Sequence, residues 1–247
     1  MRDRGTVRSL PKKKQRLSSE ERRLRILTAA IPLFAREGFR GVTTKMLARE
    51  AEVSEALLYQ HFPSKEALYL QVEILCCRAN AELERQFIGL EPSTETLVAL
   101  LFFLAQVIVE NKAVESLDGL FPRLLVHSVL EDGAFARAHM TRNLAPMAHM
   151  VCQSVTAARE HGDLVADEMP DDLRFWFSQH LLGMVHLFRM SERPVIDYSV
   201  QGPALTDAAM RFILRGVGLT AAATSRHYDY ERLGAKVAPW LACLTKG

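Results

Sequence analysis

Hydrophobic positions recur with helical spacing near the start of the chain. They lie at Leu24, Leu27, Ile31 and Phe34. These offsets place the four side chains on one face of a helix. Ser18 and Glu21 form an S-x-x-E pattern that caps a helix at its start. Pro32 predicts a bend inside this helix, and Gly38 predicts its end.

Two short helices are predicted next. The first begins near Thr43 or Thr44, each a favourable N-cap. The second begins after Ser54 and continues through Phe62, and Ser64 caps a further helix behind it. Two short helices joined by a turn of about three to four residues form a helix-turn-helix unit.

The remaining chain keeps a helical pattern. Beyond residue 70, β-branched residues never alternate with polar ones over the length of a strand. Glycine and proline separate the apolar stretches, and Pro122 and Pro146 predict kinks. We expect helices over 64–88, 94–111, 116–130, 134–160, 171–190, 204–222 and 229–244. The predicted fold class is all-α, with an N-terminal three-helix helix-turn-helix domain and a larger C-terminal helical domain.

Composition adds an uneven distribution of charge. Hydrophobic residues make up 49% and charged residues 24% of the 247 residues, which is typical of a folded soluble chain. Residues 1–71 hold 15 Lys and Arg against 8 Asp and Glu, and the rest hold 16 against 21. A basic head on an acidic body favours a polyanionic partner for the head.

Residues 1–17 are predicted to be a disordered basic arm. Two interpretations stay open for it: a solubilising tail, or an arm that contacts phosphates or a minor groove. Its basic residues are Arg2, Arg4, Arg8, Lys12, Lys13, Lys14 and Arg16.

The sequence disfavours several other classes. The cysteines, Cys76, Cys77, Cys152 and Cys243, form no C-x-x-C pair, which favours a reduced intracellular protein with no metal site. No secretory signal is visible, and the apolar stretch 97–109 is too short to cross a bilayer. No catalytic or nucleotide-binding motif is present, so we expect a cytoplasmic protein without enzyme activity, cofactor or membrane association.

Residues 43–68 read TTKMLAREAEVSEALLYQHFPSKEAL. They resemble the signature of the TetR (tetracycline repressor-like) family, close to T-x-x-x-[IL]-A-x-x-A-G-V-S-x-x-x-[IL]-Y-x-[HY]-F-x-[SN]-K-x-x-L. The upstream stretches 26–30 and 33–39 resemble the first helix of that family. The resemblance covers residues 20–70, about a fifth of the chain, and implies a bacterial regulator that binds DNA as a dimer.

The resemblance and the chemistry together predict DNA contacts. Gln60 can hydrogen-bond a base edge, and Leu57 can touch a thymine methyl. Tyr59 and His61 match family positions that contact backbone or bases, and Lys65 matches a phosphate contact. The predicted DNA-binding residues are Thr43, Thr44, Lys45, Ser54, Glu55, Ala56, Leu57, Tyr59, Gln60, His61 and Lys65.

Two departures from the signature affect this interface. Glu52 replaces the glycine of the turn, which costs about 1 kcal/mol if the position keeps a positive φ, unless the turn relaxes. Glu55 and Ala56 stand where a basic or polar residue and a glycine are common. Glu55 would repel phosphate or accept a hydrogen bond from a cytosine amino group.

The resemblance also implies a dimer and an effector. The last two long helices of such proteins form a four-helix bundle with the partner's copies. The predicted dimerisation residues are Phe177, Leu181, Met184, Phe188, Phe212, Ile213, Gly216 and Leu219. The predicted effector contacts are Phe102, Phe103, Phe121, His127, Trp176 and His180, and an apolar or aromatic effector is favoured.

These observations predict a ligand-responsive regulator. It would bind a palindromic operator in double-stranded DNA as a homodimer, act as a repressor and be released by a small effector. The alternative is a DNA-binding architectural or partner-controlled regulator that senses no small molecule. We expect a DNA-binding domain over 18–66, and a ligand-binding and dimerisation domain over 67–247.

Overall fold

The computed structural model describes residues 18–76, 81–110 and 120–244, and within them the chain is helical without a strand. The expected basic arm and Cys77 lie outside these residues. The helices are α1 (Ser19–Gly41), α2 (Thr44–Glu50), α3 (Glu55–His61), α4 (Lys65–Cys76), α5 (Ala81–Ile88), α6 (Thr94–Val109), α7 (Leu120–Leu130), α8 (Ala134–His139), η1 (Met140–Leu144), α9 (Ala145–Glu160), α10 (Asp171–Leu187), α11 (Gly202–Val217), α12 (Ala221–His227) and α13 (Tyr230–Leu244). The all-α prediction is therefore confirmed.

The first helix follows its sequence signals. Ser18 and Glu21 form the predicted capping box, each side chain bonding to the other's backbone N–H. The regular helix is broken at Gly38, whose φ is 69°. A Cβ there would lie 2.8 Å from Glu131 Oε1 and 2.9 Å from His127 Nδ1. The backbone angle therefore favours glycine, and the side chains of His127 and Glu131 would have to shift to admit a Cβ.

Two predicted helices are divided in the structure. The segment 134–160 contains a π-helical turn, η1, directly before Pro146, which lacks the N–H that would continue the regular ladder. The segment 204–222 ends at Gly218, whose φ of 93° terminates α11, and α12 begins after Thr220. Gly218 therefore stops a helix instead of lying inside one.

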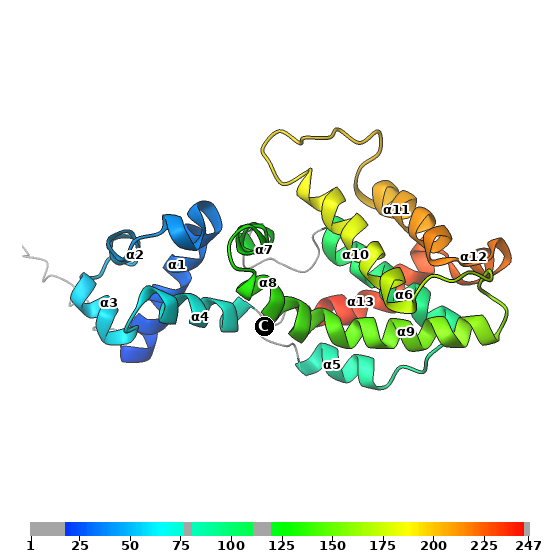
Figure 1. The fold of residues 1–247 in the computed structure, drawn as a ribbon, viewed down its shortest axis with the longest axis horizontal. Coiled ribbons are helices and arrows are strands. Elements are labelled where there is room, and N and C mark those ends of the chain that lie inside the picture. The colour runs from blue at the N-terminus through cyan, green and yellow to red at the C-terminus, as the bar shows by residue number, and fades with distance from the viewer. Residues whose placement is uncertain (1–17, 77–80, 111–119, 245–247) are drawn as a thin grey trace, which may run out of the picture.

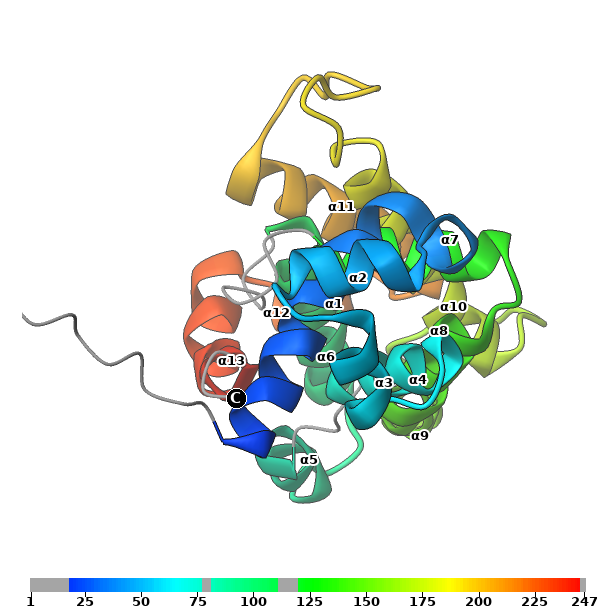
Figure 2. The same ribbon diagram turned by 90° about the vertical axis from the view of Figure 1, so that its left-hand side faces the viewer.

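The molecule is elongated, with a head and a body (Figure 1). The head contains α1 to α4, and Figure 2 looks onto it with α2 and α3 at the front. In the body α6 is buried along most of its length and packs against α9, α10, α11 and α13. Helices α7 and α8 lie between the two parts, and Leu124 and Phe135 belong to the hydrophobic cluster of the head. The head's core is thus not confined to residues 18–66.

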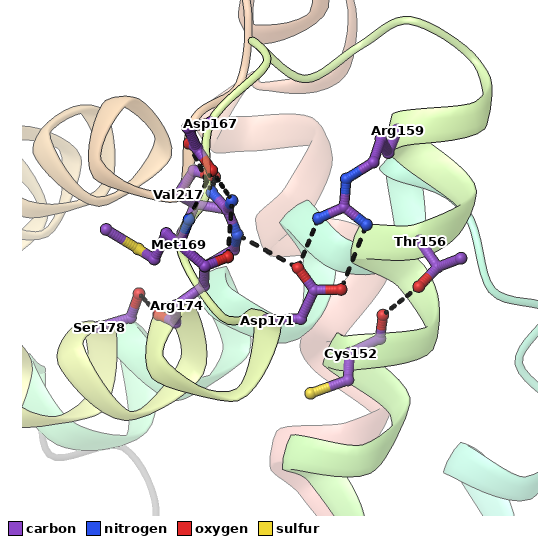
Figure 3. Close-up of polar contacts among 9 residues, drawn as sticks. All are labelled: Cys152, Thr156, Arg159, Asp167, Met169, Asp171, Arg174, Ser178 and Val217. Atoms are coloured by element: carbon purple, nitrogen blue, oxygen red, sulfur yellow. Dashed lines mark hydrogen bonds and ion pairs between the residues drawn. The ribbon is translucent and has the colours of Figure 1, made fainter.

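A buried arginine holds one end of the body together (Figure 3). The guanidinium of Arg174 on α10 pairs with Asp167, lies 3.4 Å from Asp171 and donates to the Val217 carbonyl at the end of α11. Asp171 in turn pairs with Arg159 on α9 at 2.5 Å. The bond to Arg174 lowers the pKa of Asp167. Arg174 therefore fastens α10 to the end of α11 and to the loop before α10, and Asp171 extends this network to α9.

Candidate functional site

The helix-turn-helix is built from local caps. Thr43 accepts a bond from the Met46 N–H at 3.2 Å, and Ser54 accepts one from the Leu57 N–H at 3.1 Å. These bonds satisfy orphan donors at the starts of α2 and α3. Leu58 is fully buried and packs α3 into the cluster of the head. The opposite side of α3 consequently faces solvent.

Glu52 keeps the backbone conformation of the glycine it replaces. Its φ is 54°, and it is the one non-glycine residue with a positive φ in the described part of the chain. Its carboxylate pairs with Arg25 on α1, and both side chains are largely exposed. Because exposed ion pairs contribute little, this pair offsets only part of the strain. The turn has thus not relaxed.

The predicted DNA-binding residues all remain accessible at the surface of the head. On α3 the side chains of Glu55, Ala56, Tyr59 and Gln60 are exposed. The other predicted residues are exposed or half-buried: Thr43, Thr44, Lys45, Ser54, Leu57, His61 and Lys65. They come from α2, α3 and the first turn of α4, and so lie on adjoining elements.

Two predicted contact residues already bond to each other. The Thr44 hydroxyl donates to Glu55 Oε2 at 3.1 Å, which joins the start of α2 to the start of α3. This bond restrains the Glu55 carboxylate at the N-terminal end of α3. A carboxylate in that position repels DNA phosphates and can accept a hydrogen bond from a donor on a base edge.

Lys65 has a structural role that the sequence did not reveal. Its ammonium group donates to the carbonyls of Phe39 and Val42, each at 2.9 Å, and lies 4.3 Å from the centre of the Phe39 ring. Lys65 therefore fastens α4 to the end of α1. The predicted phosphate contact stays a prediction, because only the remaining donor of the ammonium group can serve it.

The structure does not gather the predicted effector contacts around one cavity. Phe102 is fully buried against Tyr228 and Tyr230, and Phe103 is buried against Phe87 and Trp240. The other four lie on two helices: Phe121 and His127 on α7, and Trp176 and His180 on α10, where their rings are 6.4 Å apart. Phe121 packs on Phe135 and His139 beside the head, His127 lines a cleft, Trp176 packs on Phe175, and His180 is exposed. Phe102 and Phe103 are therefore corrected to core residues, because α6 is covered on all sides.

Two clefts flank the C-terminal end of α10. One of about 360 Å³ lies between α7 and the segment after α10, and most of its walls are apolar. Its lining residues are Arg123, Val126, His127, Leu187, Phe188, Met190, Ser191 and Val195. The other, of about 390 Å³, is lined by Val109, Glu110, His186, Arg189, Gly202 and Pro203. Apart from His127 and Phe188, the sequence reasoning missed these residues, because they meet only where distant helix ends converge.

The predicted dimerisation residues divide into two groups. Phe177 and Met184 on α10 are exposed by 54% and 45%, and Phe212 on α11 by 64%. Leu181, Phe188 and Gly216 are also accessible. Ile213 and Leu219, however, are 3% and 5% exposed and belong to the core of the body. They are corrected to core positions, because they lie on the inner face of α11 and in the turn behind it.

Helix α7 lies between the head and the cleft that Arg123 and His127 line. His127 lines that cleft and lies against Gly38, while Glu131 Oε1 accepts a bond from the Arg40 N–H at 3.2 Å. Within the described residues, no group of His, Cys, Asp and Glu could hold a metal ion, and no helix is long and apolar enough to cross a membrane.

Residues 26–72 match the family described as "Bacterial regulatory proteins, tetR family". Over 79 residues the chain is 39% identical to the HTH-type transcriptional regulator HbdR of Aromatoleum sp. (strain CIB), which covers 32% of this chain and 34% of that protein. The chain thus spans about a third of the length of the curated relatives it matches.

Solved structures match over more of the chain. A γ-butyrolactone receptor, described as ArpA-like, has a TM-score of 0.55 and 22% identity, covering 90% of this chain and 98% of its own. AibR, solved with isovaleryl coenzyme A and operator DNA, has a TM-score of 0.56 and 16% identity, covering 78% and 97%. At these identities the likeness concerns the fold. The chain is therefore similar to the tetR family of bacterial regulatory proteins over its helix-turn-helix, residues 26–72, and to these two proteins in fold.

Proposed function

We propose that this protein is a ligand-responsive transcriptional repressor. It binds a palindromic operator as a homodimer in the cytoplasm, and a small apolar or aromatic effector releases it. The observation that carries the proposal is the helix-turn-helix of α2 and α3. Both helices have side-chain N-caps, and α3 exposes the side chains of Glu55, Tyr59 and Gln60. The proposal includes no catalysis.

The geometry of the head supports insertion into a major groove. That groove is about 12 Å wide and admits one helix. Helix α3 is buried through Leu58 and presents its other face outward, so its side chains can reach base edges without unfolding the head. Thr43 and Lys45 at the start of α2 flank it and are placed to meet phosphates, which position a protein without specifying sequence.

The body supports a dimer through α10 and α11. Phe177, Met184 and Phe212 expose large apolar areas on two adjacent helices. On α11, Ala208 and Gly216 lie one turn on either side of Phe212, so a partner helix can approach closely. A patch of this kind on a protein surface typically marks an interaction site. Two recognition helices joined in this way would read two half-sites.

The cleft between α7 and α10 supports the effector proposal. Its apolar walls suit an apolar or aromatic molecule, and His127 lies at the junction with the head. A ligand that favours one position of α7 over another would change the placement of α1 and hence operator affinity.

The alternative regulator without small-molecule sensing also has an observation in its favour. The six predicted effector contacts do not surround a common cavity, and Phe102 and Phe103 are fully engaged in the core. Under this alternative the two clefts would be surface features only, and a partner protein or DNA architecture alone would control the regulator.

Selection of bound fragments from a random DNA library tests the proposal first. We expect a palindromic consensus, and loss of binding when the effector is added to the best fragment. Gln60→Ala should relax preference at one base pair in each half-site by about 1–3 kcal/mol. Gln153→Ala, at an exposed position on α9, is the matched control. Failure to enrich any sequence at low salt would exclude operator binding.

The dimer is tested by sedimentation. Phe212→Asp should place a charge in the proposed interface and shift the protein toward monomer, with a loss of operator affinity. Ile88→Asp is the control, because Ile88 is 81% exposed and lies on α5, away from that face. An unchanged dimer in Phe212→Asp would show that α11 is not part of the interface.

A further inference from the structure

Helix α3 carries a carboxylate at its first position. Glu55 begins the helix, its side chain is exposed, and Ser54 caps the helix directly before it. In helix-turn-helix proteins the N-terminal residues of the second helix contact base edges in the major groove. From Glu55 to His61 the helix contains no lysine or arginine. The leading end of α3 therefore bears a negative charge that no other residue of the helix balances.

A neutral group restrains this carboxylate. The Thr44 hydroxyl at the start of α2 donates to Glu55 Oε2 at 3.1 Å. Among the described residues, Thr44 is the only one whose side chain bonds to this carboxylate. The bond occupies one of the lone pairs that the two oxygens share, so Oε1 keeps its full capacity to accept. The carboxylate is thus held in place without being neutralised.

A restrained and unneutralised carboxylate limits what α3 can contact. DNA phosphates repel it, and entry into a groove removes water from it, which is costly for a charged group that gains no hydrogen-bond donor in return. The phosphates and deoxyriboses within a DNA strand offer no donor. The helix can therefore dock closely only where a base presents a donor to Glu55.

Two of the four bases present a donor in the major groove. Cytosine does so through its N4 amino group and adenine through its N6 amino group. Guanine presents two acceptors there, and thymine presents an acceptor and a methyl group, so neither can bond to a carboxylate. Adenine places the N7 lone pair beside its amino group, which repels a carboxylate, whereas the cytosine edge has no acceptor. Cytosine is therefore the best partner for Glu55.

We propose that Glu55 selects a cytosine in each half-site of the operator, and that Thr44 positions the Glu55 carboxylate for this contact. Glu55 Oε1 accepts a hydrogen bond from the N4–H of cytosine that faces the major groove. The inference rests on the proposed function, because it needs α3 to enter that groove, and it deepens the proposed function by naming one base of the operator.

Selection of bound fragments from a random DNA library by the wild-type chain and its variants tests the choice of base. We expect the wild-type chain to prefer cytosine about tenfold at one position of each half-site. Glu55→Ala should lose this preference, and Glu55→Gln should move it to adenine, since an amide can bond to both N6 and N7. Glu160→Gln, at an exposed position in the body, should keep the wild-type consensus.

Two results of this selection would overturn the proposal. One is a consensus that stays the same in Glu55→Ala, and the other is adenine in place of cytosine at the position that depends on Glu55. Thermal unfolding followed by circular dichroism checks that each variant is folded. If Glu55→Ala does not fold, Glu55→Gln carries the test, because its expected change of base does not follow from a loss of stability.

Variants of Thr44 test the positioning role. Thr44→Val should reduce the preference for cytosine about threefold, because the carboxylate loses the bond that restrains it. Thr44→Ser keeps a hydroxyl and should restore the preference. A role of Thr44 in contacting phosphate alone would weaken binding to all sequences equally. An unchanged preference in Thr44→Val would therefore exclude the positioning role.

A synthetic operator with N4-methylcytosine probes the single hydrogen bond. The pairing hydrogen on N4 must remain for guanine, so the methyl group replaces the N–H that faces the major groove. Modification of the selected cytosine should weaken binding of the wild-type chain about tenfold and leave binding of Glu55→Ala unchanged. The same modification outside the half-sites is the control and should affect neither protein. Equal losses of affinity in the wild-type chain and Glu55→Ala would overturn the proposal.

These outcomes separate the inference from the proposed function. If the wild-type chain enriches no sequence at low salt, operator binding is excluded and the inference falls with it. A palindromic consensus without a cytosine that depends on Glu55 would leave operator binding in place and overturn the inference alone.

Discussion

The polar contacts that stabilise the head and those that stabilise the body span very different distances along the chain. In the head, the caps at Ser18, Thr43 and Ser54 each bond to a backbone group three residues away. In the body, Arg174 bonds across 43 residues, and Tyr230 bonds to Glu110 across 120. The head is therefore specified by short motifs, whereas the body depends on polar side chains that meet only after the helices have packed.

This difference explains where the two parts are sensitive to mutation. Loss of a helix cap costs about 1 kcal/mol, because water can replace the lost bond. Loss of one member of a buried ion pair costs several times more, because its partners stay behind without solvent. The largest effects should accordingly fall in the body, with the head responding more weakly.

The largest effect is expected for Arg174→Leu. It removes the ion pairs with Asp167 and Asp171 and leaves the Val217 carbonyl without its donor. Because Asp167 and Asp171 stay partly hydrated, the main loss is the buried donor to the Val217 carbonyl, and we expect the free energy of unfolding, measured in urea, to fall by about 2–3 kcal/mol. Arg159→Leu is the matched control, with an expected loss below about 1 kcal/mol, because Arg159 is 47% exposed. Equal losses of unfolding free energy in both variants would show that the buried Arg174 stabilises the fold no more than the exposed Arg159 does.

Lys65 tests whether the head also contains a long-range clamp. Lys65→Met should lower the free energy of unfolding by about 2 kcal/mol, because the carbonyls of Phe39 and Val42 lose a charged donor. Lys45→Met, at an exposed position, should change the free energy of unfolding by less than about 0.5 kcal/mol.

If Lys65 contacts phosphate as well, Lys65→Arg should keep the salt dependence of DNA binding, and Lys65→Met should reduce the slope of that dependence by about one.

The boundary between head and body should be sensitive to acid. Burial lowers the pKa of His139 on α8 to about 4. The unfolded chain binds a proton near pH 6.5 and the folded chain only near pH 4, so this group destabilises the fold as the pH falls between those values. We expect a loss of about 2 kcal/mol from pH 7 to pH 5, measured by urea unfolding. His139→Gln should remove this part of the pH dependence, and His149→Gln, at an exposed position on α9, should leave it unchanged.

The smallest effect concerns the turn between α2 and α3. Glu52→Gly should raise the free energy of unfolding by up to about 1 kcal/mol, because glycine adopts a φ of 54° without strain. Glu52→Ala keeps the strain and loses the Arg25 pair, so it should be neutral or slightly destabilising. Equal unfolding free energies for the glycine and alanine variants would show that the turn carries no strain.

Prediction from sequence succeeded where the determining contacts are local. The capping box at Ser18 and the caps at Thr43 and Ser54 were predicted and are confirmed, whereas the helix end predicted at Gly38 is a break after which helical backbone resumes as far as Gly41. Prediction from sequence failed where the same pattern of apolar residues fits both a protein interface and the protein core. An apolar residue on α11 looks the same whether it faces a partner, as we propose for Phe212, or the core, as Ile213 does.

The sequence alone determined the all-α fold, the helix-turn-helix with its caps, and the exposed residues of α3, since each follows from spacing within a few positions. Only the tertiary structure decided that Lys65 clamps α1, that Phe102 and Phe103 are core, and that His186 and Arg189 share a cleft. The reason is physical: a side chain's partners across distant helices depend on how those helices pack, and no local pattern records that packing.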